Sequence, residues 1–316
     1  MAATGTARKA KRSSSARTYR LRADEPVGKG IARMARGRFA HAIDELRGKT
    51  DSTAEVAVHE ARKDLKKLRS LLRLVRDGMG GATYRRENAA LRDIGRSLSG
   101  VRDADVMLAT LDDLEERFTG ELPPDVAGGL RQALEAHRRM LDVDGDQDAL
   151  PALDEARRRV RLWAPDGDDF DVVQGGLERG YRRGRQAWRS ALADPSAETL
   201  HEWRKRAKDL WYHLLILRDA WPPVLEPLAD QAHELSDRLG EDHDLALLSD
   251  FAYAHAPDLD GAERVEELVA VIAPRREELR AEAFDVGARL YADRPGAFSR
   301  RMRKLFEAWR EPAAKH

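Results

Sequence analysis

The sequence predicts an all-α protein made of two helical bundles that are related by pseudo-twofold symmetry through an internal duplication. From about residue 27 onward, apolar residues recur at helical spacing, and no segment shows the period-two alternation of a half-buried strand. An eight-residue pattern, HExRKxxK, occurs twice, at His59–Lys66 and at His201–Lys208. A second pair, Leu98–Asp103 and Leu239–Asp244, follows the two motifs at nearly the same separation. Two motifs that return in the same order indicate a repeated structural unit.

Clusters of Gly, Pro, Asp and Ser mark the expected helix ends. In the first half we expect helices over residues 27–49, 54–77, 82–98, 101–118 and 124–142. In the second half we expect helices over residues 170–193, 197–219, 224–239, 243–254, 260–292 and 297–311.

The chain divides into four segments on the same reasoning. Residues 1–26 are predicted to form a disordered basic tail, because residues 1–22 carry seven bases and no acid. Residues 27–164 form the N-terminal helical half, residues 165–311 the C-terminal half, and residues 312–316 a short tail. The boundary between the halves is placed at the Pro/Gly/Asp cluster of residues 164–169.

Composition excludes several classes of function. The 316 residues include no Cys, so disulfides, thiolate zinc sites and Cys nucleophiles are excluded. No apolar run approaches the roughly 20 residues that a membrane span needs, and no secretory signal begins the chain. We therefore expect a cytoplasmic protein without a membrane partner. The sequence leaves its oligomeric state open.

Net charge is zero, but the charges are segregated along the chain. Residues 59–76 hold seven Lys or Arg against two acids, whereas residues 103–125 hold eight acids and one base. A neutral total can thus coexist with a strongly positive face.

The two motif helices each predict a cation arc opposite an apolar stripe. A helix turns about 100° per residue, which places one group of side chains on the front and Leu65, Leu68 and Leu72 on the back. A solvated face normally mixes charge signs, so a nearly acid-free arc indicates a polyanionic partner such as phosphate. The predicted arcs comprise His59, Arg62, Lys63, Lys66 and Arg73 in the first half, and His201, Arg204, Lys205, Lys208 and Tyr212 in the second.

No catalytic residue, metal ligand or cofactor is predicted, so the protein is expected not to be an enzyme. A zinc-protease HExxH site is excluded because Lys63 and Lys205 stand at the second His position. A metal site made of the histidines with Asp103 or Asp244 is the alternative, and Arg102 at the position matching His243 argues against it. Both aspartates are expected to cap helix starts. His59 and His201 could contact a ligand directly or be structural.

The two HExRKxxK helices, each followed about 40 residues later by L(S/G)xx(R/H)D, resemble the CHAD domain, the conserved histidine α-helical domain, over about residues 27–311. The resemblance implies two helical bundles whose basic helices line a central groove or pore that binds inorganic polyphosphate. Arg36-Gly37-Arg38 and Arg183-Gly184-Arg185 resemble further basic positions of the family. One departure is that Lys67-Leu68-Arg69 is replaced by Asp209-Leu210-Trp211 in the second half.

The expected partner is therefore inorganic polyphosphate or another polyanion, including sulfate or phosphate ions. Within the cell, the protein is expected to associate with polyphosphate granules. The alternatives are a nucleic-acid binder, which would gain from more stacking aromatics than Tyr212 alone, and a metal-dependent phosphohydrolase or phosphotransfer enzyme. The predicted ligand-binding residues are Arg33, Arg36, Arg38, His59, Arg62, Lys63, Lys66, Arg73, Arg102, Arg182, Arg183, Arg185, His201, Arg204, Lys205, Lys208, Tyr212 and His243.

Overall fold

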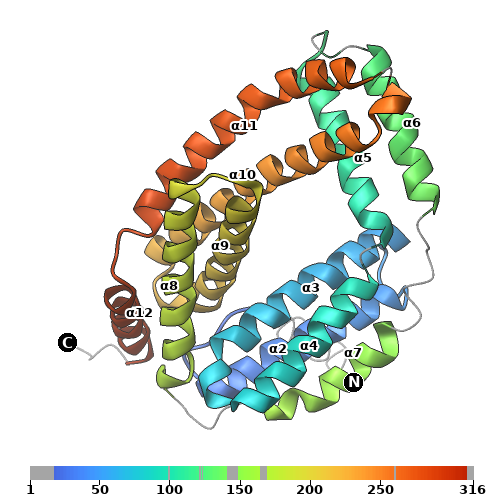
Figure 1. Cartoon of the computed structure of the whole chain (residues 1–316). Coiled ribbons are helices and arrows are strands. Elements are labelled where there is room, and N and C mark those ends of the chain that lie inside the picture. Colours follow the sequence, from blue (N-terminus) through green and yellow to red (C-terminus); the bar gives the residue numbers. More distant parts are fainter. Residues whose placement is uncertain are drawn as a thin grey trace, which may run out of the picture.

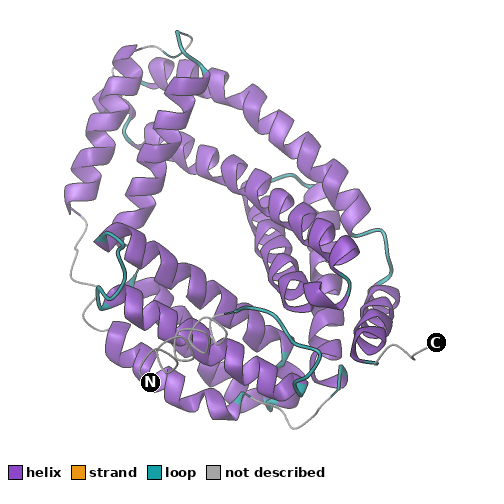
Figure 2. Cartoon of the chain, turned by 180° about the vertical axis from the view of Figure 1, so that it is seen from behind, coloured by secondary structure: helices purple, strands orange, loops and turns teal. Residues whose placement is uncertain are grey.

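The structure, a computed structural model, describes residues 18–98, 100–120, 122, 124–140, 149–163, 169–259 and 261–311, and of residues 100–103 the backbone alone. Its regular elements in this part of the chain are helices without a strand, which confirms the all-α prediction (Figure 2). The first half contains α2 (Val27–Leu46), α3 (Ala54–Leu74), α4 (Gly81–Ser97), α5 (Gly100–Arg117), α6 (Pro124–Met140) and α7 (Ala149–Arg158). The second contains α8 (Asp171–Ala193), α9 (Ala197–Leu217), α10 (Pro222–Ala254), α11 (Ala262–Leu290) and α12 (Pro295–Arg310).

The helices pack in the same order in both halves. In the first, α3 lies between α2 and α4, α5 packs on α6, and α7 packs on α2. In the second, α9 lies between α8 and α10, α10 packs on α11, and α12 packs on α8. The halves meet where α3 contacts α8 and α9 and where α5 contacts α10 (Figure 1). This shared order agrees with a duplication, while the twofold relation itself stays a prediction.

Both motif helices begin in the same way. The side chain of Thr53 accepts a hydrogen bond from the backbone N–H of Val56, and that of Ser196 accepts one from Thr199. These caps satisfy N–H groups that have no partner inside the helix, so each helix starts at the residue that follows its cap. The predicted starts at residues 54 and 197 are confirmed.

Two clusters of buried side chains form the core, and each draws on both halves. One joins α2, α3, α4 and α7 to α8, α9, α12 and parts of α10 and α11, and includes Leu68 and Leu210. The other joins α5 and α6 to α10 and α11, and includes Leu111 and Leu248. Because each half buries its apolar stripes partly against the other, the two halves share their cores.

Three expectations about the elements are corrected. Helix α7 was not predicted, although Ala149, Leu153, Ala156 and Val160 follow helical spacing and are fully buried. Helix α10 runs unbroken where two helices, 224–239 and 243–254, are predicted, because Gly240 continues the helix instead of ending it. Asp244 therefore lies inside α10 and caps no helix start.

The third correction concerns residues 18–26, which pack against the body instead of belonging to a disordered tail. Leu21 is buried, its backbone N–H donates to Ile216 O (2.9 Å), and Tyr19 donates to Lys67 O (2.9 Å). Residues 1–17 and 312–316 and most of the predicted boundary at 164–169 lie outside the described residues. None of the described helices combines the length and the apolar composition that crossing a membrane would need.

Candidate functional site

The two motif helices touch through their C-terminal halves. His213 Nε2 of α9 lies 3.2 Å from Ser70 O of α3, and Ser70 Oγ lies 3.5 Å from Asp209 O. Arg73 of α3 forms an ion pair with Asp209 of α9 (2.7 Å). The C-terminal half of each predicted arc therefore joins the two halves of the molecule.

This contact overturns the predicted position of Tyr212. Its side chain is 2% exposed, and its ring packs edge-on against Tyr19 and stacks on Trp211. A helical wheel places Tyr212 with the cations, but α3 and the segment before α2 cover that side of α9. Tyr212 is a core residue, and the part of the arcs that reaches solvent lies in the N-terminal half and the middle of each helix.

In these N-terminal halves, the Glu of each motif pairs with the Lys three residues later. Lys63 Nζ lies 2.8 Å from Glu60 Oε1, and Lys205 Nζ lies 3.1 Å from Glu202 Oε2. The expectation of a nearly acid-free, self-repelling arc is therefore wrong. Both lysines stay substantially exposed, so these pairs hold the ammonium groups in place and contribute little to stability.

The motif arginines occupy matching positions with different partners. Arg62 Nη1 donates to Leu98 O at the end of α4 (2.6 Å). Arg204 lies against Gly240 in the middle of α10, where an added Cβ would be 3.0 Å from its Nη2. Because α10 is unbroken, its carbonyls are used within the helix. The Nε of Arg204 is buried, with no hydrogen-bond acceptor among the described residues.

Two histidine rings lie in tilted contact beside this arginine. The rings of His201 and His243 have centroids 4.2 Å apart. Burial, together with the nearby His243, Lys205 and Arg204, lowers the pKa of His201 to about 4, while Glu202 opposes the shift. Burial also lowers the pKa of His243, as does Arg204, while Asp244 and Asp242 oppose the shift. Both imidazoles are therefore neutral near pH 7. The side chain of Arg102, the counterpart of His243, lies outside the described residues.

The basic residues of α2 and α8 divide into two groups. Arg33 binds Glu25 and the carbonyls of Thr18 and Arg20, and so holds the segment before α2. Arg38 is buried against Asp64, and Arg185 donates to Tyr291 O. Each of these three arginines uses at least one of its donors within the chain. Arg36, Arg182 and Arg183 are exposed, and Arg182 pairs with Glu178.

A buried network behind α3 was not predicted. Asp64, which lies inside the first motif, is 2% exposed and accepts from Arg38 Nη1 (3.0 Å). His41 Nδ1 lies 2.6 Å from the other carboxylate oxygen of Asp64, and His41 Nε2 lies 3.3 Å from Glu45 Oε1. These bonds tie α2 to the back of α3 and so fix the helix that carries the first cations. The sequence signal for this role is a second acid inside a mostly basic motif.

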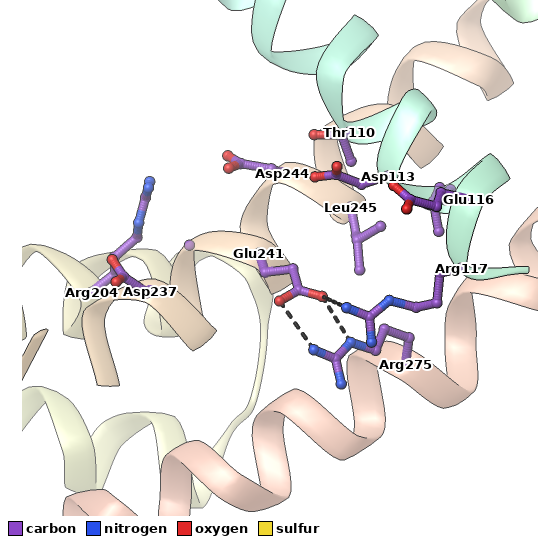
Figure 3. Close-up of a pocket in the computed structure, with 12 residues that line it drawn as sticks. Thr110, Asp113, Glu116, Arg117, Arg204, Asp237, Glu241, Asp244, Leu245 and Arg275 are labelled. Carbon is purple, nitrogen blue, oxygen red and sulfur yellow. Dashed lines mark hydrogen bonds and ion pairs between the residues drawn. The ribbon is translucent and has the colours of Figure 1, made fainter. Parts of the chain in front are cut away.

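A cavity of about 670 Å³ lies between α5, α10 and α11, with Arg204 at one end (Figure 3). Its other charged walls are mostly acidic, and include Asp113, Glu116, Asp237 and Asp244. Glu241 is paired with Arg275 at 2.7 Å. The cations of the motif helices thus adjoin an acidic hollow at this end. Among the described residues, no three His, Asp or Glu side chains are placed to hold a metal ion.

Comparison with known protein families finds a match that includes both motifs. A family model described as the CHAD domain matches residues 33–253, from within α2 to near the end of α10. The matched region contains both HExRKxxK helices and both of the segments that follow them. No curated protein matches the chain. On this match, which covers more than half of its length, the chain belongs to the CHAD domain family.

Proposed function

We propose that this protein binds inorganic polyphosphate without transforming it, through the N-terminal half and the middle of α3 and α9. The cation surface comprises His59, Arg62, Lys63, Lys66, His201, Arg204, Lys205 and Lys208. The observation that carries the proposal is that two helices in mutual contact present the same set of cationic residues. Membership of the CHAD family supports a polyphosphate-related function in general.

Two kinds of side chain in the cation surface, the lysines and Arg204, have the properties that binding a phosphate requires. Lys63 and Lys205 are held by their glutamates and exposed, and each offers further donors beyond the one used in its pair. The buried Nε of Arg204 lacks an acceptor among the described residues, and a buried donor without a partner costs free energy until an acceptor arrives. A flexible chain of phosphates can supply acceptors to both helices at once.

The proposal is tested by replacing one lysine in each motif. In Lys63→Ala/Lys205→Ala, both side chains lie on the exposed arc, so the affinity for long-chain polyphosphate should fall at least about tenfold, or about 1.4 kcal/mol. The free energy of unfolding should change by less than about 1 kcal/mol, because exposed pairs contribute little. The readout is a binding titration at fixed salt beside a urea unfolding curve.

The matched control is Lys29→Ala/Lys304→Ala, which removes the same charge from exposed positions on α2 and α12. Its affinity should stay within about twofold of the parent protein. An equal loss of affinity in both double variants would contradict a localised site, since only the total charge would then matter.

Nucleic acid would use the same cations, so it is the natural competitor. Because Tyr212 is buried, the second arc offers little aromatic surface for base stacking. We therefore expect single-stranded DNA to displace polyphosphate only at a large excess of phosphate units. Displacement at equal concentrations would favour nucleic acid as the ligand.

A further inference from the structure

A second group of arginines lies at the junction of the two halves, away from the cation surface. A small hollow of about 20 Å³ is bounded by α3, α4, α8 and α9. None of the eight residues of the cation surface lines it. Among the described residues that do line it, Asp209 is the one acid, facing Arg73, Arg76, Arg179, Arg183 and Arg206. Asp77 and Glu202 pair with Arg179 and Arg206 from just outside the lining, and the five arginines still leave the hollow with a net positive charge.

Carboxylates hold several of these guanidinium groups in position and leave some of their N–H donors unused. Asp209 pairs with both Arg73 (2.7 Å) and Arg206 (3.4 Å). Arg179 pairs with Asp77 at 2.6 Å and donates to Arg73 O. A guanidinium has five N–H donors, so each retains donors after one carboxylate is bound. Fixed donors around a net positive charge are what an anion requires.

His213 lies at the buried side of this hollow and is 1% exposed. Its Nε2 faces Ser70 O, which can only accept, so Nε2 carries the proton. Its Nδ1 has no partner among the described residues. A Cβ added at Gly180 would lie 3.2 Å from this nitrogen, so the glycine leaves room beside it. Burial lowers the pKa of His213, which keeps the ring neutral and leaves Nδ1 as an acceptor.

We propose that this junction pocket is a second anion site, which takes one hydrogen phosphate group, either free phosphate or the end group of a polyphosphate chain. A hollow of about 20 Å³ admits one oxygen-sized group. The P–OH of the ligand enters it and donates to His213 Nδ1. The remaining oxygens stay toward solvent, where Arg183 is exposed and makes no ion pair with the described residues. Sulfate, which carries no proton near neutral pH, lacks the donor that Nδ1 requires.

Occupation of this site would stabilise the contact between the halves. The pocket is built from α3 of the first half and α8 and α9 of the second, so one phosphate would engage both. A ligand that binds only the folded protein raises its melting temperature, and the shift grows with the logarithm of the ligand concentration once this exceeds the dissociation constant. Phosphate should therefore act as a stabiliser whether or not the cation surface is intact.

The test is a melting-temperature titration with sodium phosphate, with sodium sulfate at equal ionic strength as the comparison. The parent protein, Lys63→Ala/Lys205→Ala and Arg182→Ala should all be stabilised by phosphate and much less by sulfate. Arg183→Ala should need at least about tenfold more phosphate for the same shift, the loss of about 1.4 kcal/mol. Arg182 is the matched control, because it is the exposed neighbouring arginine and lies outside the pocket.

Three results would overturn the proposal: no shift with phosphate, an equal shift with sulfate, or an identical response of Arg183→Ala and Arg182→Ala. None of these depends on long-chain binding at the cation surface, so failure here is distinct from failure of the proposed function.

Whether the ligand is free phosphate or the end of a polyphosphate chain is tested in Lys63→Ala/Lys205→Ala, in which the cation surface is weakened. Short and long polyphosphates are compared as competitors of phosphate at equal phosphate-unit concentration. Stronger competition by the short chains, which have more ends, identifies chain ends as ligands. Competition by neither chain, with the phosphate response retained, identifies free phosphate.

Discussion

At the scale of single residues, the local partner decides what a motif position does. Arg62 and Arg204 are the same residue in two copies of one motif, yet Arg62 closes the end of α4 through Leu98 O. Arg204 faces the unbroken α10, and its buried Nε has no acceptor among the described residues. We infer that Arg204 is the arginine better placed to take a phosphate oxygen. The sequence alone could not separate the two, because the difference arises from the helices against which they pack.

The paired histidines, His201 and His243, predict how the stability of the folded protein depends on pH. The folded protein holds the pKa of His201 near 4, whereas the unfolded chain has a pKa of about 6.5. Between these values the unfolded state binds more protons, so stability falls as pH falls from about 6.5 toward about 4, and is level above that range for this group. Urea unfolding of the parent protein at pH 7 and pH 5 measures the loss.

The control for this prediction is His201→Gln, which keeps a polar side chain and removes one titration. Its stability should change less between pH 7 and pH 5 than that of the parent. An equal change in both proteins would show that His201 does not contribute. His243 and His213, whose pKa values are also lowered by burial, should account for part of the remaining dependence.

Residue positions on the arcs could be predicted only where nothing packs over them. The wheel placed Lys63 and Lys205 on the exposed side, and the structure finds them there. It also placed Tyr212 and Arg73 on that side. The contact between α3 and α9 instead buries Tyr212 and pairs Arg73 with Asp209. A helical angle gives direction within one helix and carries no information about the helix that packs against it.

At the scale of elements, the two halves differ most in the segment after the motif helix. The first half breaks between α4 and α5, whereas α10 runs through the matching position at Gly240. The capped starts of α3 and α9 could be predicted from Thr53 and Ser196, since capping is a local interaction. Whether a glycine ends a helix depends on packing, and here Arg204 occupies the space that the missing Cβ leaves.

This arrangement predicts opposite effects of Gly240→Ala on folding and on binding. Alanine favours the helix by about 1 kcal/mol over glycine, and the group that its Cβ meets is the flexible end of Arg204. The free energy of unfolding should therefore be unchanged or rise by up to about 1 kcal/mol. Affinity for polyphosphate should fall several-fold as Arg204 is displaced.

The comparison for Gly240→Ala is Gly128→Ala in α6, where a Cβ would meet nothing within 4 Å. That variant should gain stability and keep its affinity. Unchanged affinity in Gly240→Ala would contradict the role assigned to Arg204. Both variants are measured by urea unfolding and polyphosphate titration.

At the scale of the whole molecule, the halves are joined by a close approach of two backbones. A Cβ added at Gly176 of α8 would lie 1.8 Å from Leu74 O at the end of α3. No side-chain rotation relieves a clash with backbone, so Gly176→Ala must separate the helices. We expect it to lower the free energy of unfolding by about 3 kcal/mol or more. Gly95→Ala, in open space on α4, should instead stabilise by about 1 kcal/mol.

The duplication was visible in the sequence, but the way in which the halves join was not. Repeated motifs predict two similar units, and the packing order of the helices agrees with that. The shared cores and the junction around Asp209 rest on contacts between residues more than a hundred positions apart. One sequence records no such pairing, so the junction pocket could not be predicted.

The central claim is that cations of both motif helices contact phosphates, and the salt dependence of binding tests it most directly. For a single-stranded polyanion, the slope of log affinity against log salt is about −0.7 per phosphate contact. Lys63→Ala/Lys205→Ala removes two contacts, so its slope should be shallower than that of the parent protein by about 1.4. A slope equal to that of the parent, or binding of the parent that does not vary with salt, would contradict the account.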